Sequence, residues 1–230
     1  MSKLDHNQPK KQDKRMDKMS VKKKCPLCYE GGRYFYCFRT IDYYQCFACF
    51  SVYMDPACHL AGEEEKKRYT EHNNDIKDPG YRQFVNPLVK CVLANQNKKE
   101  RGLDYGCGTG PVAASILAES DFSLKLYDPF FYDDRTLLQD KYDYIIAVEV
   151  IEHFKEPGRE FQKLRDLLKQ SGNLYCMTLI YDHSIDFPNW YYKNDPTHCF
   201  FYSYEAVDYI KHKYSFSSLE IDERVIFFRG

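Results

Sequence analysis

A glycine-rich turn constrains the fold of this chain more than any other segment. Residues 102–110 read Gly-Leu-Asp-Tyr-Gly-Cys-Gly-Thr-Gly, so Asp104 stands two positions before three alternating glycines, Gly106, Gly108 and Gly110. Glycine lets the backbone turn sharply out of a strand and approach a ligand closely. We therefore expect a strand that ends in a ligand-binding turn. A dinucleotide fingerprint would place its third glycine at 111, where this chain has Pro111.

The pattern Asp/Glu-x-Gly-x-Gly-x-Gly is typical of class I S-adenosylmethionine-dependent methyltransferases, and the chain resembles that family here. In the family this segment holds the methionine part of the cofactor. The resemblance implies a Rossmann-like α/β sheet and assigns cofactor contacts to Asp104, Gly106, Gly108 and Gly110.

A second cofactor residue follows the turn. Residues 111–119 are rich in Ala and Leu and predict a helix, and residues 122–127 alternate as a strand that ends at Asp128. A carboxylate about twenty positions past the turn can accept hydrogen bonds from both hydroxyls of a ribose. Asp128 therefore indicates cofactor binding, in dinucleotide enzymes as well as in methyltransferases.

Residues 142–154 predict a buried strand followed by a turn with acids and a histidine, similar to the strand-four motif of the methyltransferases. The resemblance places Glu149 and His153 near cofactor and substrate, at the carboxyl end of the sheet. Only fourteen residues separate Asp128 from Asp143, too few for a full third strand and its helices. We expect a shortened third-strand region, with residues 129–132 covering the adenine instead.

An aromatic insertion at 185–202 contains Asp195-Pro-Thr-His198, which resembles a tetrapeptide of one branch of these enzymes. Related enzymes build the substrate pocket here. Imidazole titrates near neutral pH, so His198 is the expected general base, with Asp195 beside it as the second catalytic residue. The alternative is a structural hydrogen bond between these two side chains. After the insertion, residues 203–212 predict a helix, and 216–221 and 225–229 a terminal antiparallel hairpin.

Four of the ten cysteines form two Cys-x2-Cys pairs separated by seventeen residues: Cys25, Cys28, Cys46 and Cys49. This spacing is typical of a zinc ribbon, which we assign to residues 25–60. Four thiolates close the coordination shell, so the zinc would be structural rather than catalytic. Cys37, Cys58 and His59 are spare candidates, more simply explained as packing residues.

Residues 61–98 predict a helical linker, with a loop from Tyr69 through Phe84 between two helices. The chain is similar to bacterial methyltransferases that carry a zinc ribbon before the catalytic domain, over most of 25–230. In class I enzymes this segment often covers the cofactor, which implies contacts from Tyr69, His72 and Asn73. A capping and turn cluster is the alternative.

Charge is uneven along the chain. The formal net charge is −1, but residues 1–24 hold nine Lys or Arg and three Asp, which predicts a disordered basic tail. No secretory leader or membrane span is recognisable, and ten cysteines suit a reducing compartment, so we expect a cytoplasmic protein.

These expectations combine into an S-adenosylmethionine-dependent methyltransferase with a catalytic domain at 99–230 and a small-molecule acceptor methylated on oxygen or carbon. RNA methylation is a weaker alternative, in which ribbon and tail would bind phosphates. A third is a cofactor-fold protein that binds a partner without turnover.

Overall fold

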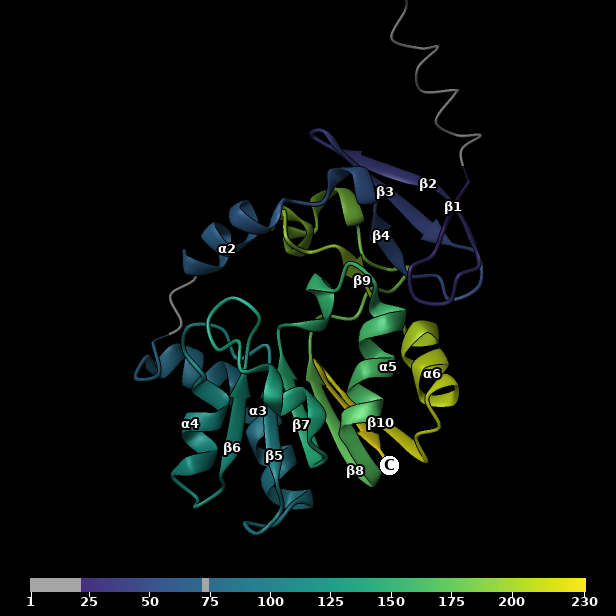
Figure 1. Ribbon diagram of the computed structural model, residues 1–230. Helices are drawn as coiled ribbons and strands as arrows, with labels where there is room; N and C mark the ends of the chain where they lie inside the picture. Colours follow the sequence, from purple (N-terminus) through teal and green to yellow (C-terminus); the bar gives the residue numbers. More distant parts are fainter. Residues whose placement is uncertain (1–21, 72–74) are drawn as a thin grey trace, which may run out of the picture.

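Two β-sheets organise the chain in the structure, a computed structural model that describes residues 22–71 and 75–230. A five-stranded sheet has the order β1-β2-β3-β4-β9, and a six-stranded sheet has the order β10-β11-β8-β7-β5-β6. Figure 1 shows the smaller sheet above the larger one. The strands are β1 Lys22–Lys24, β2 Gly31–Phe38, β3 Ile41–Cys46, β4 Val52–Met54, β5 Gly102–Tyr105, β6 Leu124–Tyr127, β7 Tyr142–Val148, β8 Leu168–Met177, β9 Phe200–Phe201, β10 Ser218–Asp222 and β11 Val225–Arg229.

The larger sheet has the predicted Rossmann-like arrangement. Strands β6, β5, β7 and β8 are parallel neighbours, and β11 and β10 add the expected antiparallel hairpin. Apolar side chains on both faces explain the two helical layers. One layer consists of α3 (Pro79–Asn95) and α4 (Val112–Ala118), and the other of α5 (Pro157–Leu167) and α6 (Tyr204–Lys213).

The third-strand region is shortened, as predicted. Between β6 and β7, a stretch that the structure describes throughout, the chain forms only a β-bridge from Asp128 to Tyr132 and a 3-10 turn at Arg135–Gln139. The short turn takes the chain back to β7 without an additional strand, so β6 is the edge of the sheet.

Two helices occupy the predicted linker, α2 (Gly62–Thr70) and α3. We predicted a loop that extends to Phe84, but α3 already begins at Pro79, so the loop is shorter than expected. The Asp78 carboxylate caps this helix by accepting from the Tyr81 backbone N–H at 2.6 Å, and proline is compatible with the first helical turn. His72 and Asn73 lie outside the described residues.

The cysteine-rich lobe extends beyond its predicted limits at both ends. Of the predicted tail, residues 1–21 lie outside the described residues, whereas Lys22–Lys24 are not disordered but pair with Gly31–Arg33 as strand β1. At the other edge, β9 from the catalytic part pairs with β4. The small sheet thus combines four strands from residues 22–54 with one strand from the catalytic part of the chain.

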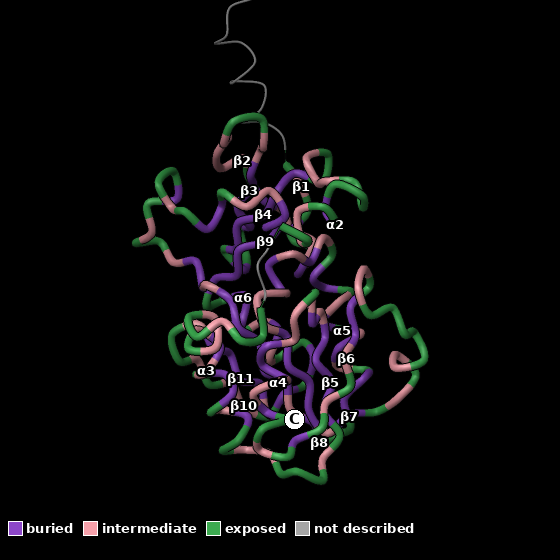
Figure 2. Tube along the Cα trace, turned by 90° about the vertical axis from the view of Figure 1, so that its left-hand side faces the viewer, coloured by how far each residue is buried: buried purple, intermediate pink, exposed green. Residues whose placement is uncertain are grey.

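The two lobes share a hydrophobic core. One buried cluster contains Cys25 and Leu27 of the cysteine-rich lobe together with Phe161 of α5 and Phe228 of β11. Figure 2 shows buried chain running from the lower strands into the upper lobe. In the described parts of the chain, no helix combines the length and apolar character that a membrane crossing requires.

Candidate active site

A cavity of about 880 Å³ opens where strands β5, β6 and β7 end. Its floor is the glycine turn, and α2 and α3 contribute the outer wall. Figure 1 shows α2 above this edge of the large sheet. The cavity is lined by most of the residues predicted from sequence: Tyr69, Asp104, Gly106, Gly108, Gly110, Asp128, Glu149, His153 and His198.

The glycine turn is held in a conformation that favours glycine. Gly106 and Gly108 have φ angles of 79° and 61°, in the left-handed region. A Cβ added to Gly106 would lie 2.7 Å from both Cγ atoms of Val150. The backbone N–H of Gly106 donates to the carbonyl of Tyr127, which joins the ends of β5 and β6. The turn is a close-approach surface suited to a cofactor.

Asp128 connects this turn to the loop that replaces the third strand. Its carboxylate accepts from the backbone N–H of Gly108 at 3.0 Å, of Phe130 at 2.8 Å and of Phe131 at 3.1 Å. Oδ1 accepts two of these bonds and Oδ2 accepts one, so Oδ2 retains a lone pair for a ligand hydroxyl. Phe130 and Phe131 line the cavity, where we predicted that this segment covers the adenine.

Asp104 is buried in strand β5, two residues before Gly106 of the turn. Burial, with a smaller contribution from the charge of Asp128, raises its pKa to about 7. The carboxylate would be stabilised by a cationic ligand, because desolvation and a like charge both disfavour it in the free protein.

Glu149 has a strained backbone at the end of β7. Its φ is 52°, unusual for a residue with a side chain, and its N–H donates to the Met177 carbonyl at 2.8 Å. The carboxylate lies 3.4 Å from the Arg224 guanidinium and 3.2 Å from the Tyr192 hydroxyl oxygen. Burial and the charge of Glu152 raise its pKa to about 8.

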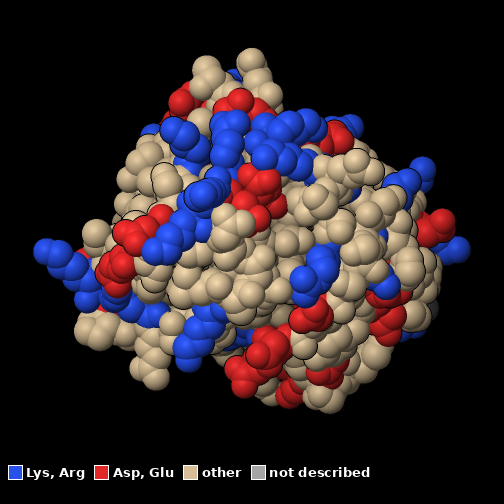
Figure 3. Space-filling view, turned by 90° about the horizontal axis from the view of Figure 1, so that it is seen from below, with Lys and Arg blue, Asp and Glu red and all other residues tan. Residues whose placement is uncertain are grey.

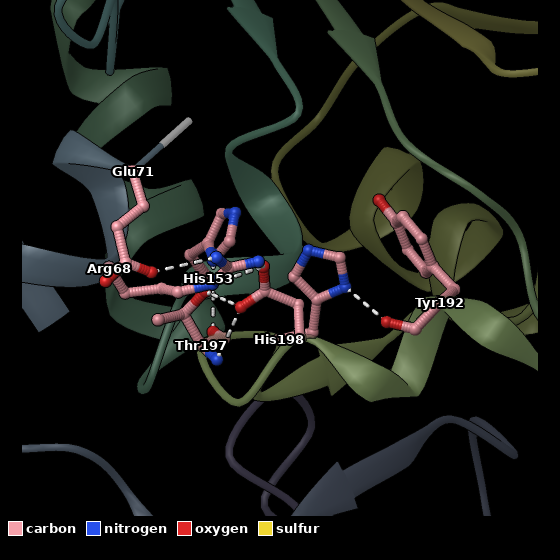
Figure 4. A network of polar contacts seen from close by, with 7 residues as sticks. Arg68, Glu71, His153, Tyr192, Thr197 and His198 are labelled. Atoms are coloured by element: carbon pink, nitrogen blue, oxygen red, sulfur yellow. Dashed lines mark hydrogen bonds and ion pairs between the residues drawn. The ribbon is translucent and has the colours of Figure 1, made fainter. Parts of the chain in front are cut away.

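Two histidine rings in the wall of the cavity pack edge to face, with ring centroids 4.8 Å apart. The Nδ1 of His153 lies 3.0 Å from the Thr197 carbonyl, and the Nδ1 of His198 lies 2.6 Å from the Tyr192 carbonyl. Figure 4 shows the His198 ring between Tyr192 and His153. A carbonyl only accepts, so both Nδ1 atoms carry a proton, and in the neutral form of each ring the lone pair is on Nε2.

Asp195 lies outside the cavity wall. Its carboxylate binds the Arg68 guanidinium of α2 at 2.9 Å and accepts from the Thr197 N–H at 3.0 Å. The side-chain bond from His198 to Asp195 that we considered as an alternative does not form through Nδ1, which pairs with Tyr192 instead. Through these contacts Asp195 holds α2 against the loop that carries Thr197 and His198.

Sequence reasoning missed several residues at the site. Tyr81 and Phe84 of α3 line the cavity, and Tyr192 donates to the buried Glu152 carboxylate at 2.5 Å. Glu152 belongs to the same motif as Glu149, so that motif was a usable signal. Nothing in the sequence distinguished Tyr192 from the many other aromatic residues of the insertion.

The four predicted metal ligands converge on one point. All four cysteines are free thiols, and their Sγ atoms lie 3.7 Å apart for Cys25 and Cys49, 3.4 Å for Cys28 and Cys46, and 3.8 Å for Cys28 and Cys49. Zn–S bonds of about 2.3 Å in a tetrahedron require about 3.8 Å between sulfur atoms. The cluster fits a four-thiolate zinc ion.

The sheet order, the glycine turn and the acids at the strand ends define an α/β cofactor-binding enzyme. A family model described as a methyltransferase domain matches residues 78–220, more than half of the chain. The chain belongs to this family, and it is an S-adenosylmethionine-dependent methyltransferase of class I. No curated protein sequence matches the chain.

Solved structures show the same fold at low sequence identity. Magnesium protoporphyrin IX methyltransferase from Synechocystis PCC 6803, solved with bound SAH, has a TM-score of 0.52 and 16% identity, over 74% of this chain and 94% of that one. The 1,6-didemethyltoxoflavin-N1-methyltransferase of Burkholderia thailandensis has a TM-score of 0.51 and 11% identity, over 85% of this chain and 98% of that one.

Proposed function

We propose that this enzyme transfers a methyl group from S-adenosylmethionine to an oxygen or carbon of a small molecule. The observation that carries the proposal is that one cavity joins the glycine turn to the two histidines. Cofactor and acceptor would therefore meet in a single partly enclosed space. Both structural neighbours named above are, by their descriptions, enzymes that act on small molecules.

Five parts of the cavity hold the cofactor in this proposal. The glycine turn and Asp104 take its methionine part, Asp128 takes the ribose, and Glu149 and Tyr69 lie beside the reacting end. When bound, the cofactor supplies an electrophilic methyl group on a sulfonium ion. The Tyr69 ring packs against His153 at 5.2 Å and Phe130 at 5.6 Å, and an aromatic face beside a cation is worth about 1 kcal/mol.

His198 acts on the acceptor. Its Nδ1–H bond to Tyr192 leaves the Nε2 lone pair free of a proton, as required of a base that accepts a hydroxyl proton. Asp195 supports this residue indirectly by tying α2 to the loop that carries His198. Placement of the reactants next to each other supplies a large part of the rate, on the order of 7–11 kcal/mol of the barrier.

The four cysteines hold a structural zinc ion in our proposal. Their closed sulfur tetrahedron leaves no position for a substrate. The ion would stabilise the small sheet, including β9. His198 lies just before β9 in the chain, so the ion would also help to hold this residue in place.

Methyl transfer from radiolabelled S-adenosylmethionine into a cell extract tests the function. We expect label in small molecules that resists ribonuclease, and loss of labelling in a His198→Ala variant that still binds the cofactor in calorimetry. Label that disappears with ribonuclease would instead support RNA methylation. Absence of cofactor binding by the wild type would reject the proposal.

A further inference from the structure

Three potential metal ligands outside the cysteine cluster gather beside the cavity. Glu152, His153 and His198 each place one ligand atom within 4.8 Å of the other two. They come from two segments, residues 152–153 and residues 197–199, that are joined by hydrogen bonds. The Cys199 N–H donates to the Glu152 carbonyl at 2.8 Å, and the His153 ring donates to the Thr197 carbonyl. The fold thus holds the three side chains in one place.

Both imidazoles are oriented as metal-ligating histidines are. Metal-bound histidine usually donates its second ring N–H to a carbonyl or carboxylate, which fixes the tautomer and the ring direction. His153 and His198 make this bond to the carbonyls of Thr197 and Tyr192. In each neutral ring Nε2 is then the nitrogen that carries a lone pair for a metal ion.

Glu152 supplies the carboxylate of the three ligands and is buried outside the cavity lining. Its side chain has no exposed surface, and the Tyr192 hydroxyl donates to Oε1 at 2.5 Å. Its Oε2 is buried and makes no hydrogen bond to any residue that the structure describes. A buried carboxylate oxygen of this kind is costly unless a cation or donor reaches it.

We propose that Glu152, His153 and His198 bind a divalent transition-metal ion whose open coordination positions face the cavity. Two imidazoles and one carboxylate suit Zn²⁺, Fe²⁺ or Co²⁺ rather than Mg²⁺. Ligand atoms around a tetrahedral ion with bonds of about 2.0 Å lie about 3.3 Å apart, so binding would draw the three side chains together. His153 and His198 line the cavity and Glu152 does not, which leaves the cavity side for an exogenous ligand.

This inference rests on the proposed methyl transfer and specifies its acceptor as an oxygen compound. The ion would accept a lone pair from an acceptor hydroxyl and lower its pKa, so that the proton leaves to solvent. The oxygen then forms the new bond to the methyl carbon while the bond from that carbon to sulfur breaks, which gives the methyl ether and S-adenosylhomocysteine. In this inference the Nε2 lone pair of His198 binds the ion, and this ligand role replaces the role of base given to His198 above, because one lone pair cannot serve both.

Cobalt titration of the reduced, metal-free, untagged full chain tests the site without any activity measurement. Cobalt bound by four thiolates gives intense charge-transfer absorption, whereas cobalt bound by nitrogen and oxygen gives only weak visible bands. We expect two cobalt equivalents per chain, one of each kind. In Glu152→Gln and His198→Gln the equivalent without thiolate absorption should bind at least tenfold more weakly or be lost.

His212→Gln is the matched control, because His212 is an exposed histidine on α6 that is 3.4 Å from Asp208. It should retain both cobalt equivalents. Calorimetry with S-adenosylmethionine checks that each variant is folded and tests the proposed function separately. Binding of a single equivalent with thiolate absorption by the wild type, or an unchanged second equivalent in both ligand variants, would overturn the metal site while leaving methyl transfer intact.

Discussion

Gly106 is the residue at which sequence and structure agree most directly, and replacing it tests the cofactor site. In Gly106→Ala the added Cβ would meet Val150 at 2.7 Å on a backbone with φ of 79°. We expect a loss of about 1–3 kcal/mol in stability and at least tenfold weaker S-adenosylmethionine binding. Thermal unfolding and calorimetry measure the two effects. Gly62→Ala is the control, because a Cβ there would have no neighbour within 4 Å.

Asp104 should make cofactor binding dependent on pH. Its pKa in the free protein is about 7, raised from 3.8, so the folded state binds the extra proton between these values. From this group alone, the free enzyme loses stability as pH rises from about 4 to 7 and then reaches a plateau. A cationic cofactor prefers the carboxylate, so its dissociation constant should increase up to about tenfold per pH unit below 7.

Calorimetry between pH 5 and 8 measures this dependence, together with the proton released on binding below pH 7. Asp104→Asn should bind the cofactor more weakly and with little pH dependence over the same range. Glu149 lines the same cavity, with a pKa of about 8. A slope that persists in Asp104→Asn would therefore assign the titration to Glu149 and contradict our prediction.

At the scale of secondary-structure elements, strand β9 connects the cysteine-rich lobe to the catalytic domain. It pairs with β4, and the Met54 N–H donates to the Cys199 carbonyl at 2.8 Å. The same lobe encloses Phe187 of the aromatic insertion between Phe35 and Tyr43. We therefore expect that disorder in the small sheet also disturbs the part of the cavity wall that contains His198.

Removing the proposed zinc should impair the acceptor side more than the cofactor side. In Cys46→Ser we expect faster amide hydrogen exchange in β3, β4 and β9 and methyl transfer at least tenfold slower. Cofactor affinity should change little, because the glycine turn belongs to the other sheet. Cys58→Ser, in the same lobe but outside the four-cysteine cluster, should behave as wild type. Equal activity of both variants would show that the lobe has no such influence.

At the scale of the whole molecule, the shared core predicts a single unfolding transition. Cys25 and Leu27 pack in the same buried cluster as Phe161 and Phe228, so the core on one face of the large sheet continues into the cysteine-rich lobe. Calorimetry of the metal-loaded protein should show one peak. Cofactor at a hundred times its dissociation constant adds about 2.7 kcal/mol, which should raise the midpoint by about 5–10 °C. Two separated peaks would contradict the shared core.

On the face of the described chain that Figure 3 shows, surface charge does not favour RNA as the acceptor. Figure 3, which views the molecule from below, shows Lys and Arg beside Asp and Glu. Several basic side chains of the described residues form ion pairs. Examples are Arg101 with Asp140 at 2.7 Å and Lys169 with Asp143 at 2.7 Å. Paired cations have less positive charge to offer a phosphate backbone.

The sequence by itself determined the class of fold, the cofactor turn and the cysteine cluster. These features depend on local chemistry, because glycine spacing, strand periodicity and Cys-x2-Cys turns are written in short segments. The shortened third-strand region also followed from counting residues between Asp128 and Asp143. Only the tertiary structure decided that β9 completes the small sheet, that Tyr192 meets Glu152, and that Asp195 binds Arg68. Those contacts join segments tens of residues apart, and no local pattern specifies which distant partner a strand edge or a buried polar group will find.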